Sequence, residues 1–273
     1  MTGFNKLKID EKKTTEELTG FINNELNKTG RKNLVVGISG GLDSAVVSAL
    51  SVKAIGAAKV TGVMMPYKTS SSENLKDAEL LIDKLGIEKY SIEITRSIDS
   101  YYDNFTDADA NRRGNKMARE RMSILFDISA MKNALVIGTS NKSEILLGYG
   151  TIFGDLACAI NPIGDLYKTQ LRQLAAYLDV PERIISKPPS ADLEVGQSDE
   201  GDFGFSYTEV DKLFYYLIDK EISPANCVEL GFSKEFINKV ITMINANQFK
   251  RSTAIIARIS SKPITPDFRV EPI

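Results

Sequence analysis

Residues 33–51 read NLVVGISGGLDSAVVSALS, and the architecture of the chain can be worked out from this stretch. A run of apolar β-formers stops at a cluster of Ser, Gly and Asp, and an Ala-, Val- and Leu-rich segment follows. A buried strand that leads directly into a helix is the opening unit of an α/β fold with a parallel sheet. The free N–H groups and positive dipole at the start of such a helix make the turn a natural site for phosphate.

The residue types in this turn also suit a phosphate. Gly40 and Gly41 let the backbone approach oxygen atoms closely. Ser39 and Ser44 add hydroxyl donors, whereas Asp43 would repel a phosphate unless Mg²⁺ lay between them. The loop lacks the lysine of a Walker A motif. The alternative is an ordinary strand-to-helix turn, with glycines for geometry and Asp or Ser as the helix cap.

The composition argues against several function classes. The chain has 273 residues and a net charge of −2, so no overall basic field favours nucleic acid. It has no histidine, and Cys158 and Cys227 form no metal-ligand cluster, so zinc is not expected and proton transfer falls to other groups. The N-terminus lacks the apolar core of a signal peptide, and no stretch has the length of a membrane span. We expect a cytoplasmic protein without nucleic-acid or membrane partners.

Strand-like and helix-like segments alternate over most of the chain. Thr14 and Glu17 have capping-box spacing and predict the start of an amphipathic helix that ends at Gly30. The alternation predicts a parallel sheet flanked by helices, in a region that extends to about residue 185. We expect strands at 34–38, 59–65, 90–94 and 134–138, and further helices at about 43–55, 73–85, 118–132 and 168–180.

The rest of the chain has two parts. Residues 186–206 lack periodicity and are rich in Pro, Gly, Ser and acidic side chains, so we expect a lid, a binding loop or a disordered segment. Apolar residues then recur at helical spacing, so 207–273 is expected to be mostly helical. Because no internal repeat is visible, we predict a single domain over 1–273.

Longer motifs resemble a known family. The SGGLDS segment at 39–44 resembles the PP-loop of the N-type ATP pyrophosphatases, which cleave ATP between its α and β phosphates. The resemblance implies a Rossmann-like adenine nucleotide α-hydrolase fold with a mostly helical C-terminal part. Within that superfamily, four segments in order resemble the ammonia-dependent NAD synthetases, namely 114–126, 138–155, 161–171 and 187–207.

The resemblance implies a ligase reaction in two half-steps. ATP adenylates the nicotinate carboxylate of deamido-NAD, and ammonia then attacks the acyl-adenylate to give NAD, AMP and pyrophosphate. Activation is needed because a carboxylate is a poor electrophile. Nothing in the chain resembles a glutamine-hydrolysing domain, so free ammonia is the expected nitrogen source. The family also implies a homodimer, with deamido-NAD lying partly across the subunit interface.

The same resemblance assigns roles to residues. Asp155 is expected near the reacting carbonyl, where it would orient ammonia or help to deprotonate ammonium. Lys168 and Asp43 complete the expected catalytic set. The expected ligand contacts are ATP on Gly37, Ile38, Ser39, Gly40, Gly41, Leu42, Asp43, Ser44, Thr139, Lys168 and Ser190, deamido-NAD on Arg119, Phe249 and Lys250, and Mg²⁺ on Asp43 and Glu144.

Each assignment has a local alternative. Arg119 stands in the sequence ARER, which is also typical of charge pairing along a solvated helix face. Glu144 is equally placed to cap the helix that it begins. The remaining alternatives are a turn residue at Thr139, a surface charge at Lys168, a turn cap at Asp155 and a solvated tail charge at Lys250.

The chain departs from the family pattern at three positions. The family more often has His where Phe249 stands, and many members have Lys and Asp where Ile152 and Ala159 stand. Neither Ile152 nor Ala159 can replace a charge. Nicotinate mononucleotide therefore stays open as an alternative substrate in place of deamido-NAD. Two other functions also stay open, namely another PP-loop ligase and a sensor that binds ATP without turnover.

Overall fold

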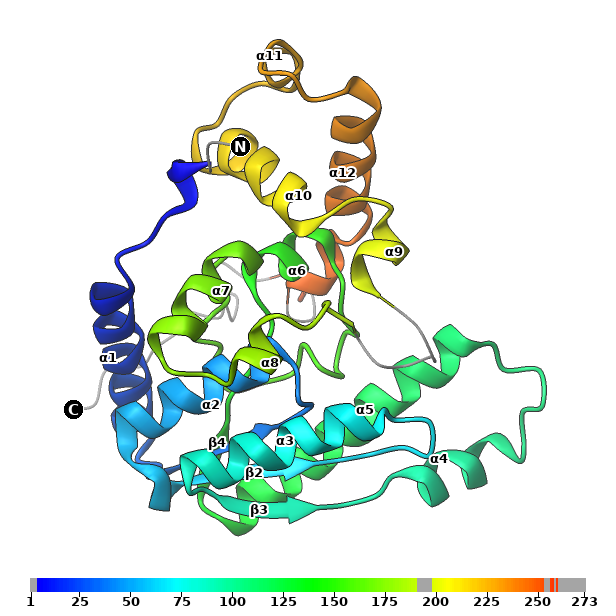
Figure 1. Ribbon diagram of the computed structural model, residues 1–273. Coiled ribbons are helices and arrows are strands. Elements are labelled where there is room, and N and C mark those ends of the chain that lie inside the picture. Colours follow the sequence, from blue (N-terminus) through cyan, green and yellow to red (C-terminus); the bar gives the residue numbers. More distant parts are fainter. Residues whose placement is uncertain (1–3, 191–197, 253–255, 258, 260–273) are drawn as a thin grey trace.

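A four-stranded parallel sheet forms the centre of the molecule (Figure 1). The computed structural model describes residues 4–190, 198–252, 256–257 and 259. The strand order is β3-β2-β1-β4 with every pair parallel, which confirms the predicted α/β class. The strands are β1 (Asn33–Gly37), β2 (Val60–Met64), β3 (Glu88–Ser91) and β4 (Ala134–Val136).

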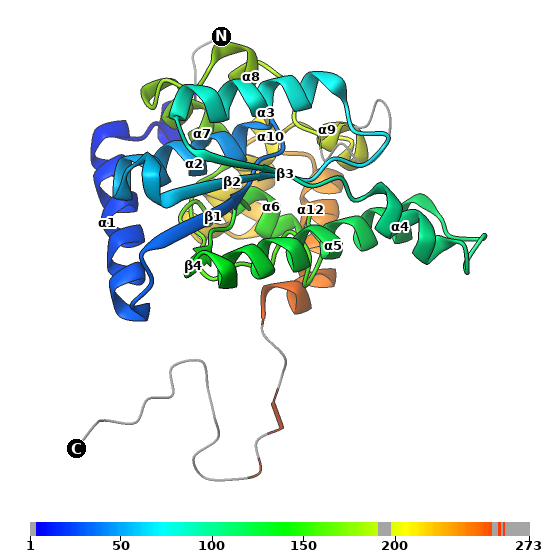
Figure 2. The ribbon, with the colours of Figure 1, turned by 90° about the horizontal axis from the view of Figure 1, so that it is seen from below.

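Helices cover both faces of this sheet (Figure 2). They are α1 (Glu11–Thr29), α2 (Leu42–Ile55), α3 (Ser72–Leu85), α4 (Thr95–Tyr102), α5 (Ala110–Met131), α6 (Lys142–Leu147), α7 (Lys168–Tyr177) and α8 (Glu182–Ile185), with a 3₁₀ turn η2 (Ala57–Lys59). The apolar side chains of α1, α2, α3 and α7 pack in one core, and those of α4 and α5 pack in another across the sheet.

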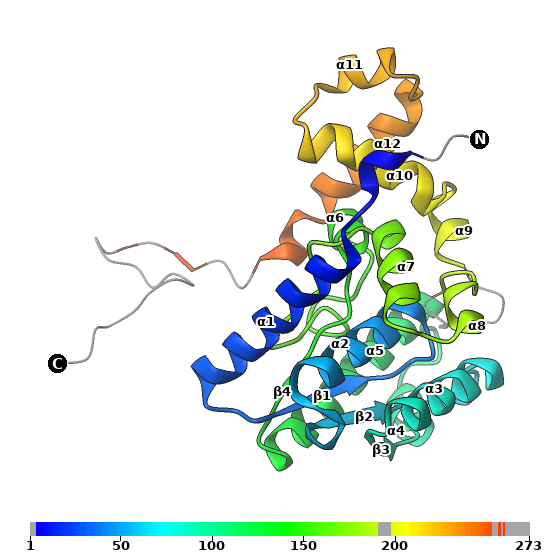
Figure 3. The same cartoon turned by 60° about the vertical axis from the view of Figure 1, so that its left-hand side comes forward.

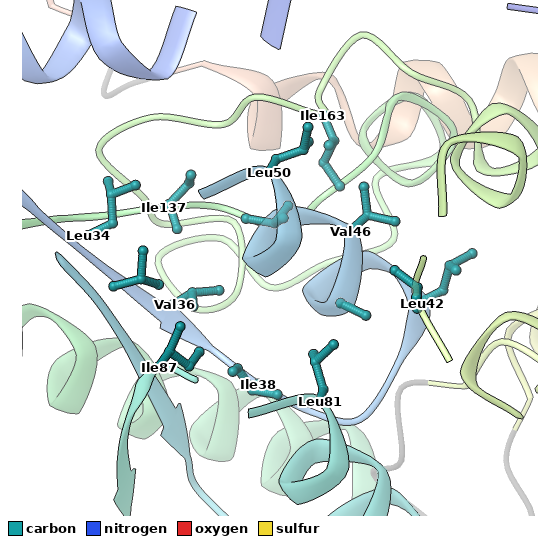
Figure 4. Close-up of a cluster of buried hydrophobic side chains, with 14 of the residues drawn as sticks. Leu34, Val36, Ile38, Leu42, Val46, Leu50, Leu81, Ile87, Ile137 and Ile163 are labelled. Carbon is teal, nitrogen blue, oxygen red and sulfur yellow. The ribbon is translucent and has the colours of Figure 1, made fainter. Parts of the chain in front are cut away.

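Strand β1 contributes to both cores. Leu34 and Val36 belong to the cluster that contains Val46 and Leu50 of α2 (Figure 4). Val35 packs on the side of α4 and α5. All five of these side chains are fully buried. A central parallel strand is covered on both faces, which is why its sequence is continuously apolar rather than alternating.

Two helices begin earlier than their sequence patterns predict. The prediction that Thr14 starts the first helix is wrong, because Asp10 is the N-cap and accepts a hydrogen bond from Lys13 N at 3.0 Å. The end at Gly30 is confirmed, with a left-handed φ of 68°. Helix α5 begins well before the predicted residue 118, since the Asp109 carboxylate accepts from Arg112 N at 2.7 Å and caps the polar segment.

The third strand lies earlier than predicted. The structure has β3 at Glu88–Ser91 rather than 90–94, because these residues pair with β2 from Thr61 onward. Beyond Ser91 the chain continues along the extension of β2, where Ile94 N donates to Pro66 O at 2.9 Å. Of the apolar residues in the predicted strand, Ile94 is therefore buried just past the ladder, while Ile92 is half-buried.

The last part of the chain forms a third apolar cluster at one end of the molecule, beyond α6 and α7 (Figure 3). Part of the predicted loop 186–206 is helical, because Ser198 caps α9 by accepting from Gly201 N at 3.2 Å. Residues 191–197 of that loop, and most residues after Ser252, lie outside the described residues. The helical elements of this last part are α9 (Asp199–Phe203), α10 (Tyr207–Phe214), the π-helical turn η3 (Tyr215–Asp219), α11 (Pro224–Glu229), α12 (Lys234–Ala246) and η4 (Gln248–Arg251). The N-terminal 3₁₀ turn η1 (Asn5–Leu7) packs against them through Leu7.

Within the described residues, no helix is both long enough and apolar enough to cross a membrane.

Candidate active site

A cleft of about 800 Å³ opens at the carboxyl ends of β1 and β4, where parallel α/β sheets place their ligands. It runs from the first turn of α2 to the loop after α6 and to η4. Every predicted site residue except Gly40 lines it. They are Gly37, Ile38, Ser39, Gly41, Leu42, Asp43, Ser44, Arg119, Thr139, Glu144, Asp155, Lys168, Ser190, Phe249 and Lys250.

The loop between β1 and α2 is shaped by its own hydroxyl groups. Ser39 Oγ accepts from Gly41 N at 3.2 Å, and Ser44 Oγ donates to Gly41 O at 3.0 Å. Gly41 is the N-cap residue of α2 and brings no side chain to the first turn of the helix. The start of a 14-residue helix therefore faces the cleft with its positive dipole end, as anion binding requires.

Gly40 has a different place from the other loop residues. Its φ is +81°, and a Cβ built on it would lie 2.1 Å from the carbonyl oxygen of Asn74 at the start of α3. The structure thus brings Gly40 against the backbone of α3 rather than to the lining of the cleft. Its glycine character is explained by this close approach and by the left-handed backbone.

Asp43, Glu144 and Lys168 converge on one point in the cleft. Lys168 Nζ lies 2.5 Å from Asp43 Oδ2 and 3.1 Å from Glu144 Oε1, and only 4% of Lys168 is exposed. Burial by itself would lower the pKa of Lys168, but the two carboxylates outweigh it and hold that pKa above its ordinary value. The interpretation of Lys168 as a surface charge is therefore wrong.

Helix capping positions Glu144. Asn141 Oδ1 accepts from Glu144 N at 3.0 Å, and Glu144 Oε2 accepts from Asn141 N at 3.3 Å, which completes a capping box on α6. Asn141 Nδ2 also donates to Asp43 Oδ1 at 2.8 Å. The capping alternative for Glu144 is correct for one carboxylate oxygen, while the other oxygen points to Lys168.

The donor set of this point fits a hard divalent cation. Asp43 and Glu144 already share one cation, the Lys168 ammonium, and Asp199 adds a further buried negative charge nearby. Burial, together with the charges of Asp43 and Asp199, raises the pKa of Glu144 although Lys168 opposes the change. Among the described residues no group of three or more His, Cys, Asp or Glu side chains that could hold a metal ion occurs. Carboxylate oxygens such as those of Asp43 and Glu144 are ligands that suit Mg²⁺.

Asp155 lies in the loop between α6 and α7. Its Oδ1 accepts from Thr151 N at 2.8 Å, so the turn-capping alternative holds for that oxygen, and the carboxyl group still faces the cleft. Desolvation of the carboxyl group by the surrounding protein atoms raises the pKa of Asp155. Lys250 braces the same loop, since its Nζ donates to Gly148 O at 2.8 Å and to Gly150 O at 3.0 Å. Lys250 is therefore not a solvated tail charge.

The other predicted substrate residues lie at the mouth of the cleft. Arg119 donates from Nε to Ile152 O at 3.3 Å, and the ion pair of its helix face joins Lys116 to Glu120 instead. The alternative interpretation, that Arg119 pairs with an acidic side chain along its helix, is thus wrong, because Arg119 binds the backbone of Ile152. Phe249 is 57% exposed. Ile152 lines the cleft, whereas Ala159 is absent from its lining.

Sequence reasoning missed a group of side chains behind the phosphate loop. Lys187 donates to Asn74 Oδ1 at 2.8 Å and to Asp77, a fully buried carboxylate on α3. Asp77 also lies 2.5 Å from Arg183 Nε. A single acidic residue in a helical pattern looks solvated, and its partners are about a hundred positions away, so no local signal marks it.

These features together define a class of protein. A parallel sheet, an anion site at the start of α2 without a Walker A lysine, and paired carboxylates at one cation position describe an α/β nucleotide-binding enzyme. Comparison with known families narrows this class. The family model described as NAD synthase matches residues 14–254, and the chain belongs to the NAD synthase family.

Relatives within the family are similar over nearly their whole length. An NH(3)-dependent NAD(+) synthetase of Chlorobium phaeobacteroides is 50% identical over 252 residues, 92% of this chain and 91% of that protein. The structure of an NH3-dependent NAD synthetase from Campylobacter jejuni matches with a TM-score of 0.80 and 37% identity, over 92% of this chain and all of that one. The structure of NMN synthetase from Francisella tularensis matches with a TM-score of 0.83 and 30% identity over the same shares.

Proposed function

We propose that this chain is an ammonia-dependent NAD synthetase, which joins ammonia to the nicotinate carboxylate of deamido-NAD at the expense of ATP. The observation that carries the proposal is that one cleft holds the phosphate loop, the Asp43–Glu144 pair and Asp155 together. In the adenylation step, ATP must lie beside the nicotinate carboxylate of deamido-NAD. In the second step, a protein group near the activated carbonyl of the substrate must position ammonia. Family membership and the relatives' names support the same reaction.

ATP is bound by the residues that the loop after β1 presents. The first turn of α2 and the serine hydroxyls receive the phosphates, and Thr139 and Ser190 line the adjoining wall. Asp43 and Glu144 would hold Mg²⁺, which when bound neutralises phosphate charge and favours departure of pyrophosphate. Lys168 would exchange its carboxylate contacts for contacts with phosphate oxygens.

Deamido-NAD enters at the opposite end of the cleft. Arg119 and Phe249 stand at its mouth, and Lys250 acts on the substrate through the loop that it braces. Asp155 orients ammonia beside the acyl-adenylate or accepts a proton from ammonium, which a carboxylate of raised pKa does well. The apolar Ile152 and the similarity to a protein described as NMN synthetase favour nicotinate mononucleotide as the second candidate acceptor.

An assay of NAD and pyrophosphate formation tests this proposal. Mg²⁺-ATP and deamido-NAD are supplied with either ammonium or glutamine, and nicotinate mononucleotide is run in parallel. We expect NAD with ammonium and at most a trace with glutamine. Amidation of the mononucleotide alone would move the assignment to the second acceptor, and no product from either would contradict the proposal.

We further propose a cytoplasmic homodimer. Cys158 and Cys227 are free thiols, as a reducing compartment requires. Phe126 and Met131 of α5 are 41% and 60% exposed, a large apolar exposure for one helix. Sedimentation equilibrium is expected to give twice the 30.1 kDa chain mass, and Phe126→Asp should weaken the dimer. Phe21→Asp on α1 is the matched control, and a monomeric parent chain would contradict the proposal.

A further inference from the structure

The helical C-terminal part places a buried carboxylate directly behind the cation position. Asp211 of α10 is fully buried and reaches the first turns of α6 and α7. Its Oδ1 accepts from Ser143 Oγ at 2.5 Å, and its Oδ2 accepts from Thr169 N at 2.9 Å and Thr169 Oγ1 at 2.8 Å. Ser143 Oγ in turn accepts from Lys168 N at 3.0 Å.

The partners of Asp211 are the sequence neighbours of two site residues. Ser143 precedes Glu144 on α6, and Thr169 follows Lys168 on α7. N–H groups in the first turn of a helix have no acceptor within the helix, so the bonds to Asp211 and Ser143 satisfy groups that would otherwise be unpaired. The result is that one carboxylate caps α7 and ties it to α6.

We propose that Asp211 is a positioning residue for the cation and phosphate site, because it sets the separation between Glu144 and Lys168. Their side chains meet at 3.1 Å. Ser143 Oγ accepts from Lys168 N, and Asp211 binds Ser143 and Thr169, the residues next to Glu144 and Lys168. Asp211 is not part of the cleft lining described above and touches no substrate there. The inference rests on the proposed function, since it assigns Asp211 to the Mg²⁺-ATP half of that site.

Calorimetric binding of Mg²⁺-ATP to the full chain, without deamido-NAD, tests this role. In Asp211→Asn the negative charge is lost, and the amide NH₂ can bond only to Ser143 Oγ, whose own hydrogen must then turn away, so the charge-assisted link between α6 and α7 is weakened. Residues that orient metal ligands typically contribute 10–100-fold to metal affinity, so we expect roughly tenfold weaker Mg²⁺-ATP binding. The KM for deamido-NAD should change less than about twofold, because Arg119 and Phe249 belong to other elements.

Asp219→Asn is the matched control. Asp219 lies at the same interface, but it accepts from side-chain tips, namely Tyr167 Oη at 2.9 Å and Lys142 Nζ at 2.9 Å. It should leave Mg²⁺-ATP affinity unchanged. An equal loss in Asp219→Asn would overturn the inference, because general loosening of the interface would then suffice. Unchanged affinity in folded Asp211→Asn, even with a lower melting temperature, would also overturn it.

Ser143→Ala guards against a folding failure of Asp211→Asn. It removes the link from Asp211 to α6 and leaves the bonds to Thr169, so weaker Mg²⁺-ATP binding is again expected and unchanged binding would contradict the inference. A parent chain that binds Mg²⁺-ATP but forms no NAD would count against the proposed function alone. A parent chain that does not bind Mg²⁺-ATP would overturn both.

Discussion

Glu144 has two tasks in one carboxylate group. One oxygen closes the capping box of α6, and the other lies 3.1 Å from Lys168 Nζ at the proposed cation position. Asp43 is the simpler partner, since it begins α2 and contacts Lys168 and Asn141 only through its carboxylate oxygens. Substitution at Asp43 therefore separates the chemistry of the site from its architecture better than substitution at Glu144.

Asp43→Ala should abolish pyrophosphate release while leaving the fold intact. We expect at least about a hundredfold loss of rate, because a cation held by two carboxylates loses one of them. Far-UV circular dichroism should be unchanged, since the side chain lies at the edge of the cleft. Asp165→Ala, a nearly fully exposed carboxylate before α7, is the control. Pyrophosphate release at the parental rate would exclude Asp43 as a metal ligand.

Gly40→Ala should lower stability more than Gly30→Ala. Both glycines have positive φ, which costs an L-residue about 1–2 kcal/mol. Only at Gly40 would the new Cβ also meet backbone, 2.1 Å from Asn74 O, whereas nothing lies within 4 Å at Gly30. Urea denaturation of the two variants measures the difference, and equal midpoints would show that the contact with α3 adjusts freely.

At the scale of elements, the loop between α6 and α7 is held from outside. Lys250 of η4 donates to two of its carbonyl groups, and Arg251 NH1 donates to Leu146 O at 3.0 Å at the end of α6. The C-terminal elements thus fix the loop that carries Asp155. A hydrogen bond that involves a charged group typically contributes about 1.5–3 kcal/mol to the stability of the folded state.

The pH dependence of amidation should report Asp155. Desolvation by the surrounding protein raises its pKa, although part of the residue is exposed in the cleft. The carboxyl group therefore stays protonated to a higher pH than an ordinary Asp, whose pKa is about 3.9. As a proton acceptor it works only when ionised, so the rate should fall as pH decreases through the raised pKa. The measurement uses a constant concentration of free NH₃. Asp155→Asn should lack this limb, and an unchanged profile in that variant would assign the limb to another group.

At the scale of the whole molecule, the N-terminal turn and helix α7 connect the sheet region with the C-terminal helical cluster. Leu7 of the N-terminal turn packs among the C-terminal helices, while Gln173 of α7 donates to Leu7 O at 3.0 Å. Tyr167 precedes α7 and belongs to the C-terminal cluster, while Leu171 of the same helix belongs to the core of the sheet. The sheet region and the helical part therefore share structural elements.

We expect a single cooperative unfolding transition for this reason. Far-UV circular dichroism follows the helices of both regions. Tyrosine signals follow tertiary packing both in the C-terminal cluster, where Tyr149 and Tyr207 lie, and beside the sheet, where Tyr67 and Tyr102 lie. Coincident melting curves would support the predicted single domain. Two separated transitions would show that the helical part unfolds independently of the sheet.

The sequence by itself determined the features that depend on neighbours along the chain. The run of buried β-formers in 33–37, the turn glycines and the Asp43–Ser44 start of α2 predicted the sheet, the phosphate loop and the class of protein. Long motifs identified the family, and the site residues that they indicate line one cleft, with the exception of Gly40. Two helix starts were predicted too late, because Asp10 and Asp109 cap polar segments that carry no apolar periodicity.

The tertiary structure alone decided which charges meet. Lys168 lies 125 positions from Asp43, and Lys187 lies 110 positions from Asp77, so no local pattern could pair them. The same holds for Asp211, whose partners lie 68 and 42 positions away. Burial makes each of these carboxylates depend on its partners, since an unpaired charge away from water is strongly unfavourable. The fold supplies those partners by bringing the first turns of separate helices to one end of the sheet.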